Sequence, residues 1–175
     1  MTTQTGALDP AAIAVHDREF VAAYSEGIRA GLIGAATIAL WFALLDGLSG
    51  RWLYTPTVLG MAIFRGGAGL DDPAAVVPSL EMVLSFTWIH VLAFLLVGIL
   101  AARLLLLAEH NSHAGFGILL LFFVFEFGFL GACMLFAEPV LHALAWPAIV
   151  VGNLLASAAM AITFWRGHRQ LIIQP

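Results

Sequence analysis

The sequence predicts an all-α integral membrane protein, a bundle of four transmembrane helices with little chain outside the membrane. Hydrophobic residues make up 62% of the 175 residues and charged residues only 10%. With a mean hydropathy of +0.99, the chain lies far outside the range of soluble globular domains. A crossing needs about 20 predominantly apolar residues. Four stretches meet this requirement: residues 27–48, 81–107, 114–136 and 143–165.

Composition also narrows the functional classes. The net charge of -4 is scattered along the chain, so nucleic acid is not indicated as a partner. Cys133 is the single cysteine and lies in an apolar stretch, which favours packing over disulfide or thiol-pair chemistry. All basic residues are arginine, a pattern typical of a GC-rich bacterial genome and hence of a bacterial inner membrane. The hydrolase motifs GxSxG and HExxH do not occur.

Residues 1–26 are predicted to form a cytoplasmic tail and an amphipathic helix. Asp9 and Pro10 are typical of an N-cap followed by proline at the first helical position. From there to about Tyr24, apolar and charged residues alternate as in a helix lying on a membrane surface or against a partner. A solvated helix leading directly into the membrane is the alternative interpretation.

The first crossing, 27–48, carries Gly27, Gly31 and Ala35 at intervals of four residues. Small residues on one face allow two helices to approach closely in lipid, so this face is expected to contact another helix. Asp46, near the far end of the crossing, is interpreted as a solvated residue or one paired with Arg51.

The first loop, residues 49–80, is expected to contain a short helix. Thr55 and Pro56 are typical of a cap and first-turn proline, and the apolar run continues to Phe64. That helix is too short to span the membrane, so it is expected to lie in the interface or to re-enter the bundle.

The arginines predict the orientation. An even number of crossings places both termini on one side together with the turn between the second and third crossings, so the tail 167–175 lies on the side of residues 1–26. Five arginines belong to this side and two to the other: Arg18, Arg29, Arg103, Arg166 and Arg169 against Arg51 and Arg65. Cytoplasmic loops carry the excess of arginine, so both termini are predicted to be cytoplasmic.

His90 and Glu126 are the main candidate site residues, because each is an ionisable residue deep in an apolar run. At a rise of 1.5 Å per residue both lie roughly 14 Å inside the outer end of their helices. Asn153 falls at a similar depth, and Thr87 is one turn from His90. The first interpretation is a layer of interhelical hydrogen bonds that determines helix register. The alternatives are a proton or ion relay through Glu126 and His90, haem or chlorophyll ligation by His90, and a metal site.

The turn between the second and third crossings is a weaker candidate. Glu109, His110 and His113 supply a carboxylate and two imidazoles that can hold a metal, although such a turn is also typical of solvated residues.

The functional expectation is a non-catalytic accessory or structural subunit of a larger membrane complex. Polar residues are sparse, and the small-residue faces suit other membrane subunits or self-association. A small proton-coupled transporter or channel using Glu126 and His90 is the alternative, and haem or pigment binding through His90 is a further one.

Overall fold

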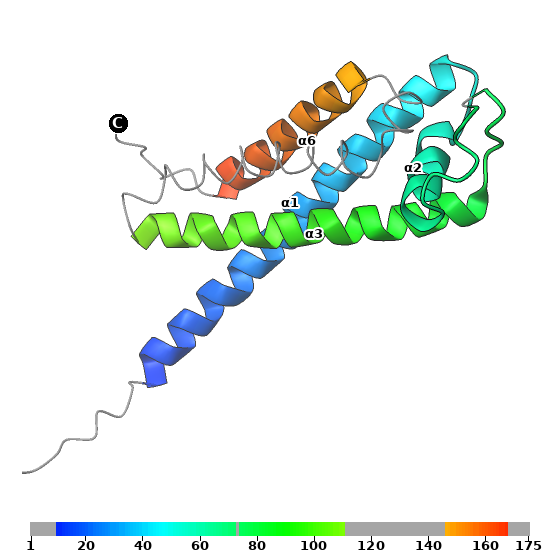
Figure 1. Ribbon diagram of the computed structural model, residues 1–175. Coiled ribbons are helices and arrows are strands. Elements are labelled where there is room, and N and C mark those ends of the chain that lie inside the picture. Colours follow the sequence, from blue (N-terminus) through cyan, green and yellow to red (C-terminus); the bar gives the residue numbers. More distant parts are fainter. Residues whose placement is uncertain (1–9, 73, 111–145, 168–175) are drawn as a thin grey trace, which may run out of the picture.

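The computed structural model of the chain describes residues 10–72, 74–110 and 146–167. Within these ranges the chain forms four helices: α1 (Pro10–Leu48), α2 (Tyr54–Phe64), α3 (Leu80–His110) and α6 (Trp146–Gly167) (Figure 1). Three of them are long and apolar enough to cross a membrane, over Phe20–Leu48, Leu80–Leu107 and Pro147–Gly167. The predicted all-α class is confirmed for the described residues. The predicted crossing 114–136 lies outside them.

Helix α1 is one continuous helix that includes both the helix predicted before residue 27 and the first predicted crossing. It begins at Pro10, where the sequence predicts a helix start, and continues without a break past Gly27 to Leu48. No proline occurs between these ends to remove a backbone hydrogen bond. The change from mixed to apolar composition near residue 26 therefore does not interrupt the helix.

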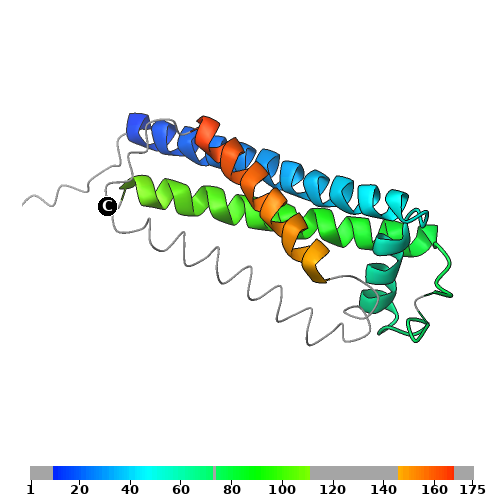
Figure 2. The ribbon, with the colours of Figure 1, turned by 90° about the horizontal axis from the view of Figure 1, so that it is seen from above.

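Helix α1 is the central element of the described bundle and packs against both α3 and α6. Residue pairs show that α3 runs antiparallel to α1, because Gly27 lies beside Gly98 and Gly31 beside Phe94. Helix α6 is also antiparallel to α1, on another face of it, since Gly34 lies beside Met160 and Trp41 contacts Ala148 near the start of α6 (Figure 2). Helices α3 and α6 therefore run in the same direction.

The short helix α2 runs across the end of the bundle rather than along it (Figures 1 and 2). Its Gly60 lies against the backbone of Met82, at the start of α3, and Val58 is fully buried. A small apolar core surrounds Val58 at this end; its other buried members are Tyr54, Leu70 and Ile149.

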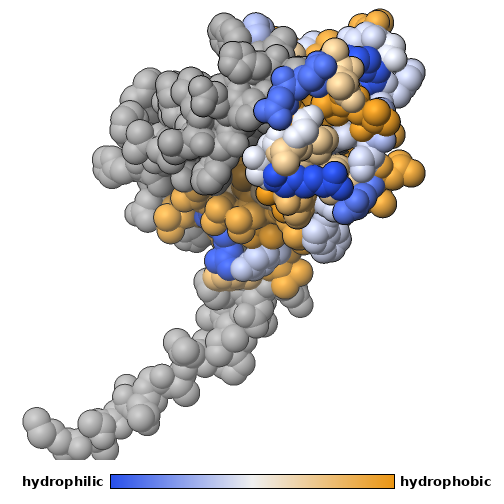
Figure 3. Space-filling view, turned by 45° about the vertical axis from the view of Figure 1, so that its right-hand side comes forward, coloured by the Kyte–Doolittle hydropathy of each residue, from blue (hydrophilic) through white to orange (hydrophobic). Residues whose placement is uncertain are grey.

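Large apolar side chains are exposed along all three long helices. Leu40 of α1, Trp88 of α3 and Leu154 of α6 are 71%, 67% and 55% exposed. Figure 3 turns the α2 end of the molecule toward the viewer and shows hydrophobic surface beside isolated hydrophilic residues. An apolar exterior of this extent suits a lipid environment.

Candidate functional site

The contact between α1 and α3 is a seam of glycines, Gly27 and Gly31 on α1 facing Gly98 on α3. A Cβ atom added to Gly27 would lie 2.7 Å from the carbonyl oxygen of Gly98 and 2.7 Å from the Cα atom of Ile99. Real side chains do not come so close to backbone, so only glycine permits this approach. The predicted small-residue face thus contacts α3, and the glycines bring the two backbones together.

His90 continues this seam toward the α2 end. Its Nε2 atom lies 3.2 Å from the carbonyl oxygen of Ala35, the residue that follows Gly31 by one turn. The imidazole ring lies between two phenylalanines of its own helix, stacked on Phe86 at 5.4 Å and tilted against Phe94 at 4.8 Å between ring centroids. A carbonyl oxygen can only accept, so Nε2 carries the hydrogen in this bond. His90 therefore joins α3 to α1 by a hydrogen bond within the apolar part of the bundle.

This geometry bears directly on ligation by His90. A metal or haem iron binds the lone pair of an imidazole nitrogen. The hydrogen on Nε2 occupies that position as long as Ala35 accepts it, so ligation through Nε2 requires the bond between the helices to break. Ligation through Nδ1, which has no hydrogen bond to a described residue, would leave this bond in place.

The other members of the expected polar layer are placed differently. Thr87 is exposed, and its hydroxyl donates to the Val83 carbonyl of its own helix at 2.7 Å. Asn153 is partly buried in α6, on the other contact face of α1. No hydrogen bond joins it to His90 or Thr87 in the described part of the chain. Glu126 lies outside the described residues.

The structure describes only part of the turn in which the sequence predicts a possible metal site. Glu109 and His110 are the last two residues of α3, where only the helical backbone is described, and His113 lies outside the described residues. Among the residues that the structure describes, no three His, Cys, Asp or Glu side chains come together as a metal site.

Asp46 has a structural role that sequence reasoning missed. It is buried, with only 5% of its surface exposed, so the interpretation of a solvated end residue is wrong. One carboxylate oxygen accepts the Thr55 N–H at 2.8 Å and the other accepts the Thr55 hydroxyl at 2.7 Å. Asp46 of α1 thus caps the first turn of α2, which starts after Leu53 in a left-handed conformation without a side-chain cap of its own. The sequence signal is an Asp shortly before a Thr-Pro helix start.

Thr57 extends the same network to α3. Its buried hydroxyl donates to the Leu53 carbonyl at 2.7 Å and accepts the Ser79 N–H at 3.2 Å. The Ser79 hydroxyl in turn accepts the Met82 N–H at 3.5 Å, near the start of α3. We call Asp46, Thr55, Thr57 and Ser79 the polar clasp, because they connect the ends of α1, α2 and α3.

Trp41 connects α1 to α6. Its indole N–H donates to the carbonyl oxygen of Ala148 at 2.8 Å, and its ring lies against Gly152. Ala148 is the second residue of the candidate crossing Pro147–Gly167. Because α6 starts at the α2 end of the bundle, this bond lies at that end. Trp41 and His90 therefore both reach from one long helix to a backbone carbonyl of another.

Comparison with protein-family models, with curated proteins and with solved structures finds no match for this chain. The function is therefore inferred from the helices and from the side chains that connect them. These contacts include a glycine seam, hydrogen bonds from His90 and Trp41 to backbone carbonyls of a neighbouring long helix, and a polar clasp at one end.

Proposed function

We propose that this chain is a four-crossing membrane protein and a non-catalytic accessory or structural subunit of a larger membrane complex. The observation that carries the proposal is the use of its deep polar side chains. His90 and Trp41 donate to the backbone carbonyls of Ala35 and Ala148, and so hold α1 against α3 and α6. Polar groups used in this way stabilise helix packing in lipid.

The directions of the helices support four crossings. Helices α3 and α6 both run antiparallel to α1, so α3 ends at the opposite end of the bundle from the start of α6. This arrangement supports the proposal of a further crossing between α3 and α6. The apolar run 114–136 is long enough to make this crossing.

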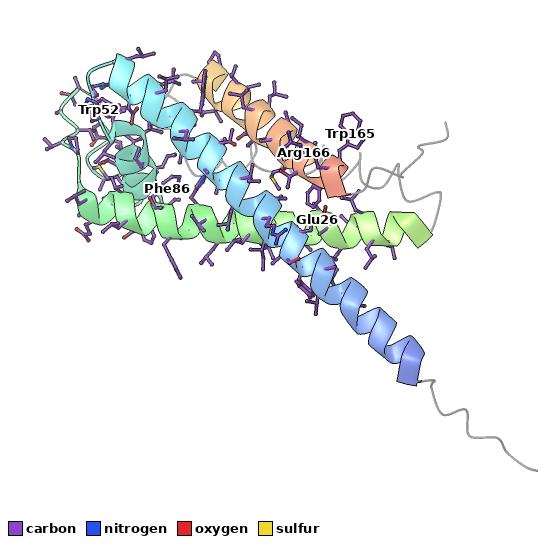
Figure 4. All side chains as sticks on the ribbon, turned by 180° about the vertical axis from the view of Figure 1, so that it is seen from behind. Glu26, Trp52, Phe86, Trp165 and Arg166 are labelled. Atoms are coloured by element: carbon purple, nitrogen blue, oxygen red, sulfur yellow. The ribbon has the colours of Figure 1, made fainter. Side chains whose placement is uncertain are left out.

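Charged and aromatic residues support an orientation across the bilayer. Arg103 and the end of α6 lie beside the first turns of the α1 crossing, whereas Arg51 and Arg65 lie at the α2 end. Two exposed tryptophans, Trp52 and Trp165, lie at opposite ends of the described bundle (Figure 4), as tryptophans do at the two membrane interfaces. By the positive-inside rule, the arginines at the Arg103 end of the bundle support the proposal that this end faces the cytoplasm.

Purification from the native membrane in mild detergent, followed by native mass spectrometry, tests the proposed function. A stoichiometric partner protein is the expected result. A homo-oligomer without partners, obtained reproducibly in two detergents, would refute the accessory-subunit proposal. The absorption spectrum of the same sample tests the haem or pigment alternative, which requires a visible band that disappears in His90→Ala.

Proton movement is the second candidate, favoured by the state of the His90 ring. Its Nε2 is hydrogen-bonded, while Nδ1 has no hydrogen bond to a described residue and so can accept a proton. Glu126, at a similar depth by sequence, is the proposed exchange partner. In proteoliposomes, a relay predicts a proton flux that Glu126→Gln abolishes without loss of assembly. No flux in the wild type would exclude it.

A further inference from the structure

Arg103 lies at the end of the bundle opposite the polar clasp, where the last turns of α3 meet α1. Leu107 ends the candidate crossing in α3 and Phe20 begins the one in α1, so Arg103 is one turn inside the end of its crossing. At such a position the long arginine side chain reaches the level of the lipid headgroups.

Two aromatic side chains of α1 hold the guanidinium. Its central carbon lies 4.3 Å from the centroid of the Phe20 ring and 4.6 Å from that of Tyr24. One terminal nitrogen also donates to the Tyr24 hydroxyl at 2.5 Å. The ring contacts orient the cation by cation–π attraction but do not neutralise its charge.

Among the side chains that the structure describes, no carboxylate pairs with Arg103. Glu26, two residues from Tyr24 along α1, has its carboxylate beside Gly167 of α6, where an added Cβ would collide with it. The ion pair Arg65–Glu81 belongs to the α2 end of the molecule. Arg103 therefore keeps its positive charge at the edge of the membrane.

The hydrogen-bonding capacity of Arg103 is also incompletely used. Its Nε atom is buried and has no hydrogen-bond partner among the described residues. A guanidinium has five N–H donors, and Arg103 uses one of them on Tyr24. The Tyr24 hydroxyl accepts that bond and still has its own hydrogen to donate. A negatively charged acceptor with several oxygens can reach the terminal nitrogens of Arg103 and the Tyr24 hydroxyl, although not the buried Nε atom.

The surroundings of Arg103 are apolar and exposed. Leu96, Leu100 and Leu107 lie on the same side of α3 as Arg103, at helical spacings of seven, three and four residues from it. They are 60%, 39% and 56% exposed. A free anion makes no use of this stripe, whereas the acyl chains of a lipid can lie along it.

We propose that Arg103 and Tyr24 bind the phosphate group of an anionic phospholipid, whose acyl chains lie along Leu96 and Leu100. The guanidinium fork binds two phosphate oxygens, and the Tyr24 hydroxyl donates to one of them. Phe20 orients the guanidinium from α1. The lipid thereby contacts α1 and α3 together where their crossings meet the interface.

Lipid binding is tested on the purified full chain in detergent with phosphatidylglycerol, phosphatidylcholine and inorganic phosphate as separate probes. Native mass spectrometry measures the bound fraction of each. The expected result is saturable binding of phosphatidylglycerol, weakened about tenfold by Arg103→Gln, with weak binding of phosphatidylcholine. Arg29→Gln is the matched control, because Arg29 is an exposed arginine of α1. It is expected to change binding by less than about twofold.

The variants also separate folding from binding. Circular dichroism tests whether Arg103→Gln is folded. If it is not, Arg103→Lys replaces it as the test variant, because lysine keeps the charge but lacks the planar fork. Arg103→Lys is expected to bind phosphatidylglycerol several times more weakly than wild type. If Arg103→Gln and Arg29→Gln weakened phosphatidylglycerol binding equally, general charge attraction would explain the binding and the proposal would be overturned. Equal binding of the two lipids, or displacement of phosphatidylglycerol by millimolar inorganic phosphate, would overturn the assignment to an anionic lipid.

Discussion

At the scale of single residues, polar side chains in this protein are accommodated in an apolar molecule by pairing with backbone groups. His90 and Trp41 donate to carbonyls of a neighbouring helix, and Asp46 accepts an N–H and a hydroxyl from Thr55. Lipid offers no hydrogen-bond partners, so each such group must find one within the protein.

His90→Phe is expected to destabilise the protein by about 0.6–2 kcal/mol, the range measured for hydrogen bonds between membrane helices. The substitution keeps an aromatic ring between Phe86 and Phe94 but removes the N–H that reaches Ala35. The free energy of unfolding, measured by titration with sodium dodecyl sulfate, reports the loss. Thr87→Val is the matched control, because its hydroxyl bonds only within α3; a stability of His90→Phe equal to that of this control would contradict the role assigned to His90.

Asp46→Ala is expected to lower the free energy of unfolding, measured by titration with sodium dodecyl sulfate, by roughly 1–3 kcal/mol. The substitution leaves the buried N–H and hydroxyl of Thr55 without their acceptor. Since Asp46 connects α1 to α2, cleavage of the loop around residues 65–72 by added protease should also become faster. Asp71→Ala removes an exposed carboxylate from the same loop and should leave both measurements unchanged. Protease resistance equal to wild type in Asp46→Ala would show that the cap does not hold α2.

At the scale of elements, α1 organises the described bundle because two of its faces carry small residues. Gly27 and Gly31 face α3, and Ala30 and Gly34 face the side where Met160 and Phe164 of α6 pack. Glycine in a helix interior lowers helix propensity by about 1 kcal/mol relative to alanine. Here that loss is offset by the close contact between backbones that glycine alone permits.

Gly31→Ala is expected to destabilise the protein by about 1–3 kcal/mol although alanine is the better helix former. The new methyl group would meet the carbonyl group of Phe94 and lie 3.0 Å from the Cα atom of Leu95, so α3 would have to move. Unfolding in detergent measures the change in free energy. Ala36→Leu adds volume to an exposed position of the same helix and should have little effect. Stabilisation by Gly31→Ala would mean that the seam is looser than the structure indicates.

At the scale of the whole molecule, the described helices form a bundle with two different ends. The α2 end carries the polar clasp and the ion pair Arg65–Glu81. The other end carries Arg103 with its aromatic neighbours and the last turn of α6. Between the ends, the long helices expose large apolar side chains, which suits a lipid environment.

The proposed topology predicts that the α2 end faces away from the cytoplasm. In a Cys133→Ala background, Ser49→Cys is expected to react with a membrane-impermeant maleimide added to intact cells, because residue 49 is exposed at that end. A cysteine in place of Thr3 should react only after the cells are opened. The reverse pattern would invert the orientation, and reaction of both in intact cells would contradict an even number of crossings.

The sequence by itself determined the all-helical class and the presence of long apolar helices that could cross a membrane. A crossing must be a contiguous apolar run with its backbone hydrogen bonds satisfied internally, so it is visible in local composition. The short helix ending at Phe64 and the small-residue face of α1 were predicted for the same reason, since both depend on neighbouring residues.

Only the tertiary structure decided which distant groups meet. Counting residues along separate helices predicted that His90 and Asn153 lie at one depth. The rotation of each helix about its own axis decided that His90 bonds to Ala35 and that no hydrogen bond joins it to Asn153 in the described part of the chain. The sequence suggested that Asp46 is solvated or paired with Arg51, because its actual partner, Thr55, comes within reach only when α2 folds back across the end of the bundle. The aromatic contacts of Arg103 depend on the antiparallel register that the glycine seam imposes. Register and rotation are properties of packed pairs of helices, and hydropathy along one chain does not contain them.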